Sequence, residues 1–313
     1  MKNLLETEEK EMLEILARAG CFVAIIVLGY VLRRVGFFKE EDFKVLSKIV
    51  LRITLPAAIV SSFSGKQIDP ALLSLALIGL GGGIIYMVIA YVINRGRGKE
   101  HQAFEMLNTA GYNIGNFTLP FVQSFLGPMG VITTSLFDTG NACVCLGGSY
   151  SVASSVKEGS GFSAKRILKS MLKSVAFDSY IVMITLNLLH ISLPSVVVSF
   201  ADIIANANAF MAMLMIGVGF KLSGEKSQIG SIVRILVVRY SVALLIALGC
   251  FFLLPFSLEV RQALVILAFS PIASAAPPFT EELKGDVGLS SAVNSISIVC
   301  SIIIIVVILI IML

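Results

Sequence analysis

Ten apolar segments, most of them long enough to cross a lipid bilayer, constrain the fold of this chain more than any other feature. They cover residues 15–35, 43–63, 69–94, 101–126, 129–156, 166–190, 194–220, 229–254, 259–283 and 286–313. A helix needs about 20 mainly apolar residues to span the hydrocarbon core. Only 14% of the residues are charged, against roughly 25% in soluble domains. We therefore predict an all-α integral membrane protein with ten transmembrane helices.

The basic residues are unevenly distributed between the loops. Loops after odd-numbered segments contain Arg33, Arg34, Lys39, Lys44, Lys48, Arg95, Arg97, Lys99, Lys157, Lys165, Arg166, Lys169, Lys173, Lys221, Lys226, Arg234 and Lys284. Loops after even-numbered segments contain only Lys66 and Arg261. Lysine and arginine accumulate in short cytoplasmic loops. The pattern predicts cytoplasmic odd loops and both termini outside the cytoplasm, in the plasma membrane.

A short motif occurs twice along the chain. Both copies read Pro-Phe-x5-Gly-x2-Gly, and they begin at Pro120 and Pro278, an offset of 158 residues. The same offset aligns segments one to five with segments six to ten, and it aligns Asn116 with Ser274. The motif therefore indicates an internal repeat.

The number of segments in each half sets the orientation of the repeats. Five spans are an odd number, so the two halves have opposite topology in the membrane. We predict a first five-helix repeat over residues 1–157, a short cytoplasmic linker over 158–165 and a second, inverted repeat over 166–313.

Segments four and nine carry residues that interrupt helices. Segment four contains Gly111, Gly115 and Pro120, with Asn113 and Asn116 between them. Segment nine contains Ser-Pro-Ile-Ala-Ser-Ala-Ala-Pro-Pro at positions 270–278. A spanning helix is broken only where protein or a water-filled cavity satisfies the freed backbone groups, and transporters bind their cargo at such breaks.

The two breaks predict a site for an anion. Helix N-termini at a break carry partial positive charge, and amide side chains can donate to a carboxylate. The alternative is a pair of proline kinks whose amides bind their own backbone. We favour a binding site because both halves carry the break.

Ionisable residues inside spans are costly and usually face the protein interior. Asp138 and Asn141 lie one turn apart in segment five, and Asp138 is a candidate carrier of a coupling proton or, alternatively, a permanently hydrogen-bonded strut. Arg52 could pair with a substrate carboxylate, but we favour a structural pairing with Asp138 or Asp178. For Arg239 we expect an internal ion pair.

Other patterns favour packing over chemistry. Glycines at 79 and 81–83 resemble a phosphate loop but lack the following Lys-Ser/Thr, so we expect them to pack helices. The five cysteines lie in apolar segments, and no histidine or carboxylate completes a metal set near them. We predict no metal and no cofactor.

Several segments resemble the auxin efflux carrier family. The resemblance is carried by Leu-Pro-Ala at 55–57, Asn-Ile-Gly-Asn-Phe-Thr-Leu-Pro at 113–120, Phe-Asp-Thr-Gly-Asn at 137–141, and Pro271-x-Ala273 followed by Glu281 and the small residues after Gly285. It covers essentially the whole chain. It implies the ten-helix inverted-repeat fold shared with bile acid/sodium symporters, in which broken helices four and nine cross and a scaffold domain moves against this crossover domain.

The resemblance also suggests a function and a location. Bacterial members of the family are malate or malonate permease-like, and plant members export auxin. The minimal central loop is similar to that of prokaryotic members, so the bacterial inner membrane is expected. By motif, Asn113, Asn116, Pro120 and Pro271 would build the crossover site. We add Asn141 and Ser274 as substrate-binding candidates.

We therefore predict a secondary active transporter of small organic anions, such as malate, malonate or auxin-like weak acids, that works by alternating access. The alternative is a sodium-coupled organic anion symporter, in which Asn113, Thr118 and carbonyls near Pro271 could bind sodium. A membrane enzyme would need paired catalytic groups in a recognisable motif, and a sensor would not need two broken helices. Expected partners are the anion and membrane lipid, without nucleic acid; a homodimer is left open.

Overall fold

The structure is a computed structural model that describes residues 2–159, 162–220 and 228–312. Within these ranges every regular element is a helix, so the predicted all-α class is confirmed. Residues 160–161 of the predicted linker, and Lys221 and Lys226 of a predicted cytoplasmic loop, lie outside the described residues.

Five helical stretches are long and apolar enough to cross a membrane: Met12–Arg34, Pro70–Ile93, Ser195–Gly219, Ile229–Leu253 and Val287–Met312. They belong to α1 (Lys2–Arg34), η2 (Pro70–Ser74) with α4 (Leu75–Ile93), α11 (Ser195–Ala205) with α12 (Asn208–Gly219), α13 (Ile229–Leu253) and α16 (Val287–Met312). Helices of this length and hydropathy are typical of integral membrane proteins.

The other apolar segments consist of shorter helical pieces. These are α2 (Asp42–Ile49), η1 (Val50–Thr54) and α3 (Leu55–Phe63); α5 (Lys99–Thr109), η3 (Ile114–Thr118) and α6 (Leu119–Phe125); α7 (Gly127–Cys143), η4 (Val144–Gly148) and α8 (Ser149–Glu158); α9 (Ala164–Met171) and α10 (Val175–Leu188); α14 (Leu258–Ala268) and α15 (Ala276–Glu282).

Two of the π-helical turns, η1 and η3, end at the threonine of a Thr-Leu-Pro sequence whose leucine and proline begin the next helix. Proline has no N–H, so it leaves a carbonyl one turn earlier without its usual donor. The preceding N–H groups then pair five residues back, from Leu55 to Val50 and from Leu119 to Ile114, which widens the turn. The prolines therefore set where the π-helical turns lie.

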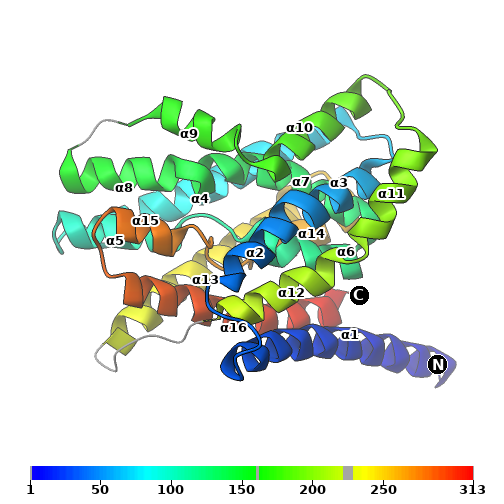
Figure 1. Cartoon of the computed structure of the whole chain (residues 1–313), viewed down its shortest axis with the longest axis horizontal. Coiled ribbons are helices and arrows are strands. Elements are labelled where there is room, and N and C mark those ends of the chain that lie inside the picture. The colour runs from blue at the N-terminus through cyan, green and yellow to red at the C-terminus, as the bar shows by residue number, and fades with distance from the viewer. Residues whose placement is uncertain (1, 160–161, 221–227, 313) are drawn as a thin grey trace.

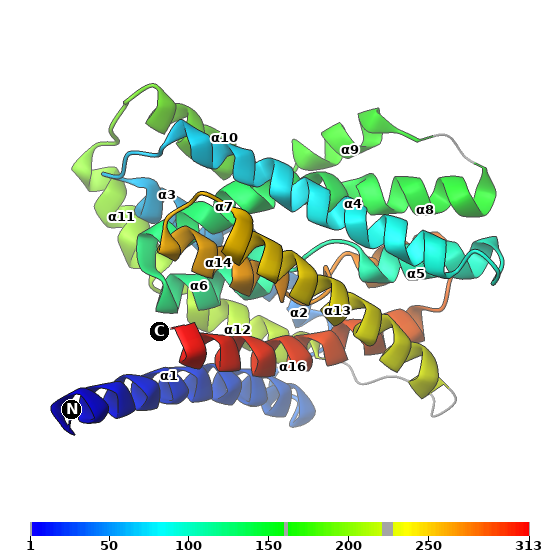
Figure 2. The ribbon, with the colours of Figure 1, turned by 180° about the vertical axis from the view of Figure 1, so that it is seen from behind.

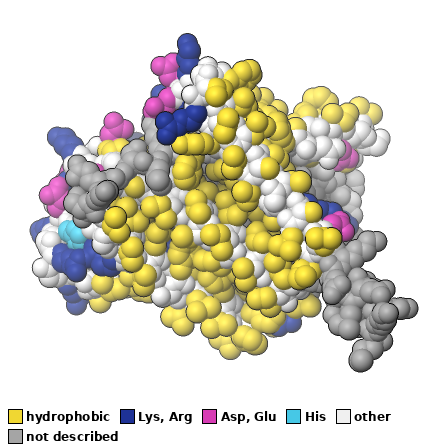
Figure 3. All heavy atoms as spheres, turned by 90° about the horizontal axis from the view of Figure 1, so that it is seen from below, with side chains coloured by type: hydrophobic (Ala, Val, Ile, Leu, Met, Phe, Trp, Pro, Cys, Tyr) yellow, Lys and Arg dark blue, Asp and Glu magenta, His cyan; other side chains and the backbone are white. Residues whose placement is uncertain are grey.

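The helices run mainly side by side, and their connections gather at two ends (Figures 1 and 2). The α4–α5 and α15–α16 connections lie at the left end in Figure 1, whereas the α10–α11 connection, the start of α1 and the end of α16 lie towards the right. The face seen from below is broadly apolar, with most of the visible lysines and arginines towards its left and upper edges (Figure 3).

Two groups of helices pack closely within themselves, and α7 of the second group also packs on α3 and α10 of the first. In one group α1 packs on α12, and α3 packs on α10 and α11. In the other, α4 packs on α7, α5 on α8, and α13 on α14 and α16. Glycines let the backbones approach: a Cβ added at Gly79 would overlap the Phe137 carbonyl, and one at Gly217 the Ile26 carbonyl. The expectation that the glycine run packs helices is confirmed for Gly79.

Candidate functional site

The helix of segment four is interrupted between Thr109 and Ile114. α5 ends at Thr109, and residues 110–113 are not helical. Gly111 adopts a φ of 74°, which L side chains rarely adopt, and a Cβ there would lie 2.7 Å from Cys145 Sγ. Pro120 follows after the break, in the first turn of α6, and its missing N–H accounts for the π-helical turn η3 before it. Gly111 thus places the break within the segment where the sequence predicted it.

The helix of segment nine is interrupted between Ala268 and Ala276, and the two interruptions contact each other. The Asn113 N–H donates to the Pro271 carbonyl at 2.9 Å. Asn116 Nδ2 donates to Ser274 Oγ at 3.0 Å. In addition, Thr118 Oγ1 donates to Ser270 Oγ at 2.7 Å. Four of the six predicted substrate-binding residues, Asn113, Asn116, Pro271 and Ser274, therefore lie at one crossing point.

Asparagines from the following helices hold both breaks. Asn141 of α7 donates to the Tyr112 carbonyl at 3.0 Å and accepts from the Tyr112 N–H at 3.1 Å. Asn294 of α16 donates to the carbonyls of Ile272 and Ala273 at 2.9 and 3.2 Å. These amides satisfy backbone groups that lipid could not. Both ends of the Asn141 side chain are therefore engaged with the backbone of the break in segment four.

Asp138 is partly buried beside this staple. Its Oδ1 accepts from Asn141 Nδ2 at 2.7 Å, and its Oδ2 accepts from the Tyr180 hydroxyl at 2.9 Å. Asn141 thus links Asp138 directly to the break in segment four. The arrangement fits the strut that the sequence offered as an alternative, and it also places a titratable carboxyl one side chain away from the break.

Arg52 does not meet either of the carboxylates that were expected to neutralise it. It lies exposed in η1, and Asp178 lies exposed in the first turn of α10. Among the ion pairs of the described residues, none joins Arg52 to Asp138 or Asp178. The favoured structural pairing is therefore not formed, because both oxygens of Asp138 are taken by neutral donors.

A polar cavity of about 530 Å³ opens beside the crossing point. Ser274 and Asn294 line it on the side of the breaks, and Arg33, Glu40 and Lys44 line the opposite side. Next to Ser274, the Oδ1 atom of Asn116 is buried without a hydrogen-bond partner among the described residues. A buried acceptor without a partner is unusual in proteins. The cavity therefore offers room beside the crossing, and Asn116, which does not itself line the cavity, has an unused acceptor next to Ser274.

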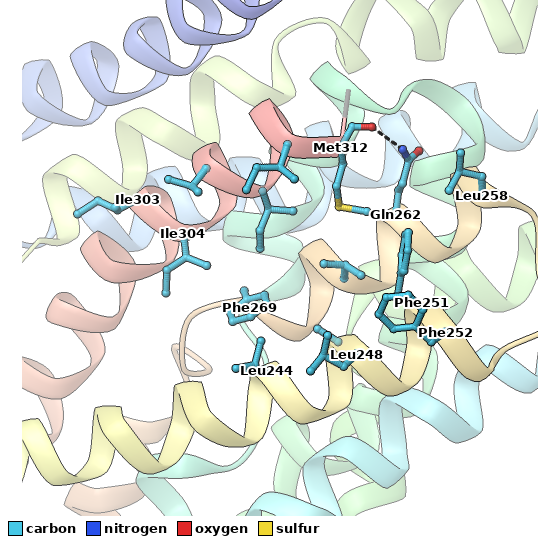
Figure 4. A pocket seen from close by; sticks show the side chains of 15 residues that line it. Leu244, Leu248, Phe251, Phe252, Leu258, Gln262, Phe269, Ile303, Ile304 and Met312 are labelled. Atoms are coloured by element: carbon cyan, nitrogen blue, oxygen red, sulfur yellow. Dashed lines mark hydrogen bonds between the residues drawn. The ribbon is translucent and has the colours of Figure 1, made fainter.

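A second cavity, of about 610 Å³, is almost wholly apolar (Figure 4). Side chains of α13, α14 and α16 line it, among them Leu248, Phe251 and Ile304. Gln262 is the one polar side chain in its lining, and its Nε2 donates to the Met312 carbonyl at 2.8 Å. This cavity lacks charged groups, so the polar cavity is the better candidate for binding an anion.

Sequence reasoning misassigned Arg239 and did not identify Asn294. The guanidinium of Arg239 donates to the carbonyls of Thr109 and Ser270 at 2.6 and 3.0 Å, and none of the described ion pairs includes it. The expected ion pair of Arg239 is therefore wrong. An arginine in the middle of an apolar 25-residue helix signals a buried partner, but the signal does not tell a carboxylate from a carbonyl.

Comparisons with known proteins relate this chain to membrane transporters. Residues 21–163 match the model of a family described as membrane transport protein. The chain is also 22% identical over 289 residues to an uncharacterized transporter of Methanothermobacter thermautotrophicus, covering 90% of this chain and 93% of that protein. The resemblance to the auxin efflux carrier family is thereby confirmed for residues 21–163, the stretch that matches this family model.

Proposed function

We propose that this protein is a secondary active transporter of small organic anions, which it moves by alternating access at the helix crossing. The observation that carries the proposal is the contact between two interrupted helices beside a polar cavity. Interrupted helices that meet at mid-depth are the usual cargo sites of secondary transporters. Malate, malonate and auxin-like weak acids are the substrates that we propose to test.

The proposed architecture is ten transmembrane helices in two inverted repeats. Two hydrogen-bonded pairs at the crossing, Asn113 with Pro271 and Asn116 with Ser274, are each 158 residues apart, which is the offset of the repeated sequence motif. Residues related by a two-fold axis meet their own equivalents only near that axis. The pairs therefore support a pseudo-two-fold axis that passes through the crossing.

In this proposal the two groups of packed helices are the two domains that move relative to each other. The group of α1, α3, α10, α11 and α12 would be the scaffold, and the group that contains both breaks would be the crossover domain. Thr54 Oγ1 of the first group donates to Asn208 Oδ1 at 2.9 Å, and Asn208 Nδ2 donates to Gln123 Oε1 of α6 at 3.2 Å. This short polar chain, and the hydrogen bond from Tyr180 of α10 to Asp138 of α7, would have to rearrange when the domains move.

Basic side chains on the second segment favour an anionic substrate. Lys44, Lys48 and Arg52 recur every four residues and are all exposed, and Lys44 lines the polar cavity. Residues four apart lie on one helix face. An exposed arginine halfway along a span is costly in lipid, so we infer that Arg52 faces water between the two groups and contacts the substrate carboxylate.

Proton coupling would use Asp138. A change of protonation at Asp138 would alter its hydrogen bond with Asn141, and Asn141 holds the backbone of Tyr112 at the break. Protonation of Asp138 would therefore change the geometry of the cargo site through Asn141.

Sodium coupling is the second candidate, and the occupancy of its expected ligands argues against it. The Pro271 carbonyl accepts from the Asn113 N–H, and the carbonyls of Ile272 and Ala273 accept from Asn294. The Thr118 hydroxyl donates to Ser270. A sodium ion would have to compete with these N–H donors for the carbonyl oxygens, whereas the Thr118 oxygen, whose hydroxyl is the donor, could still coordinate it.

Uptake of labelled malate and malonate into proteoliposomes tests the proposal. We expect accumulation under an imposed pH gradient, without sodium. Accumulation that requires a sodium gradient would select the symporter alternative. If neither acid is taken up, auxin-like aromatic acids are tested next, and absence of flux for every weak acid would contradict the proposed function.

A further inference from the structure

Arg239 occupies the place between the two helix breaks where a bound cation would be most stable. Its side chain is fully buried, with 0% of its surface exposed, and it is the largest of the fully buried side chains. It reaches the Thr109 carbonyl at the end of α5 and the Ser270 and Pro271 carbonyls just after α14, at 2.6, 3.0 and 3.4 Å. A single guanidinium therefore joins both interrupted helices.

The positive charge of the Arg239 guanidinium is offset without a carboxylate. The C-terminal end of a helix carries roughly half a negative charge, so the ends of α5 and α14 together offset about one positive charge. The rings of Tyr86 and Tyr112 lie 4.2 and 4.7 Å from the guanidinium carbon and add the favourable face of two aromatic rings. The Tyr86 hydroxyl also donates to the Arg239 carbonyl, at 3.2 Å.

We propose that Arg239 is a built-in cation of the helix crossing, which takes the place that a coupling metal cation would otherwise take. The arginine locks the two breaks into one body and keeps their carbonyls from binding sodium. It does not line the polar cavity, so it acts on the substrate through the breaks and not by contact. The consequence for transport rests on the proposed function, whereas the cation site itself does not.

Chemical rescue tests the site directly. Arg239→Ala leaves a space bounded by the three carbonyls and two tyrosine rings, which fits a free guanidinium ion. We expect the Tm of purified Arg239→Ala to fall by about 10 °C, since breaking a buried charged group's bonds is costly. Millimolar guanidinium chloride, far below denaturing concentration, should then recover at least half of the loss, and equal tetramethylammonium chloride, whose cation cannot donate hydrogen bonds, should recover none.

Matched variants make the result specific. Arg261 also binds a carbonyl, that of Phe251 at 2.9 Å, and lies against the Phe251 ring, but it does not touch the breaks. Arg261→Ala should show no guanidinium-dependent rise in Tm. Arg239→Lys keeps the charge but cannot reach both breaks at once, so its Tm should fall by less than that of Arg239→Ala.

Three outcomes would overturn the proposal. They are a folded Arg239→Ala protein whose Tm does not respond to guanidinium, an equal rescue by tetramethylammonium chloride, and an Arg239→Lys variant as stable as the wild type. If Arg239→Ala does not fold, the Tm of Arg239→Lys relative to that of the wild type still tests the proposal. Because the readout is thermal stability, a failure of anion uptake would contradict the proposed function and leave the cation site standing.

Discussion

Asn116 has one end of its side chain engaged and the other free. Its Nδ2 binds Ser274, whereas its buried Oδ1 has no partner among the described residues. A rearranged Asn116 could donate to a substrate carboxylate, and its Oδ1 could accept from a substrate hydroxyl or a water molecule. At the scale of single residues, this amide is the most direct test of the crossing as a cargo site.

We predict that Asn116→Ala raises the KM for the transported anion roughly 10- to 100-fold, because a hydrogen bond to a charged group is worth about 1.5–3 kcal/mol. Radiolabelled uptake at several concentrations measures the change. Asn206→Ala is the matched control, since Asn206 is exposed at the end of α11 and does not reach the crossing. Unchanged uptake by Asn116→Ala would refute the proposed cargo site.

Asp138→Asn tests proton coupling. We expect the variant to exchange substrate across the membrane at near wild-type rates and to lose accumulation driven by a pH gradient, since an amide does not titrate. Counterflow and gradient-driven uptake measured on the same proteoliposomes separate the two activities. Asp202→Asn is the control, because Asp202 binds the Ser61 hydroxyl and lies outside the Asp138 network. Retained gradient-driven uptake in Asp138→Asn would assign the carboxyl to the strut role.

At the scale of elements, glycines and prolines decide how closely helices approach and where they break. The two Thr-Leu-Pro sequences each produce a π-helical turn, one before α3 and one before α6. Gly79 of α4 faces the backbone of α7, whereas a Cβ added at Gly81 of the same helix would meet no neighbouring element within 4 Å among the described residues. Identical residue types two positions apart thus have opposite roles.

We predict opposite effects of alanine at these two glycines. Gly79→Ala should lower the free energy of unfolding by about 1–3 kcal/mol, because the new methyl group pushes α4 from α7. Gly81→Ala should raise it by about 0.5–1 kcal/mol through the lower backbone entropy of the unfolded chain. Thermal denaturation of the purified variants measures both. Equal effects of the two substitutions would show that α4 and α7 do not pack through Gly79.

At the scale of the whole molecule, the basic residues should orient the protein in the membrane. Lys66 lies in the connection after α3 and Lys99 begins α5. In a variant without its five native cysteines, Lys66→Cys should react with an impermeant maleimide on intact cells, and Lys99→Cys only after permeabilisation. The reverse pattern would invert the proposed topology, and labelling of both from outside would contradict the span count.

The sequence predicted features that depend on local chemistry. Apolar length alone identified the segments that the structure builds from helices. Gly111 in segment four and Pro271 in segment nine indicated where the helices are interrupted. The repeated motif even aligned Asn116 with Ser274, which form a hydrogen bond. Such predictions succeed because helix length and helix breaking are decided by neighbouring residues.

Tertiary structure decided which polar groups meet. Buried polar groups inside a membrane protein must find partners, but many partners are compatible with one sequence. Arg239 therefore received carbonyl ligands in place of the expected carboxylate, and Arg52 remained without either of its expected partners. The sequence by itself determined that the chain is helical, apolar and broken at two places. What holds those breaks was decided only when the helices packed. Several of the hydrogen bonds at the breaks, such as those from Arg239 to Thr109 and from Asn116 to Ser274, join residues more than 100 positions apart.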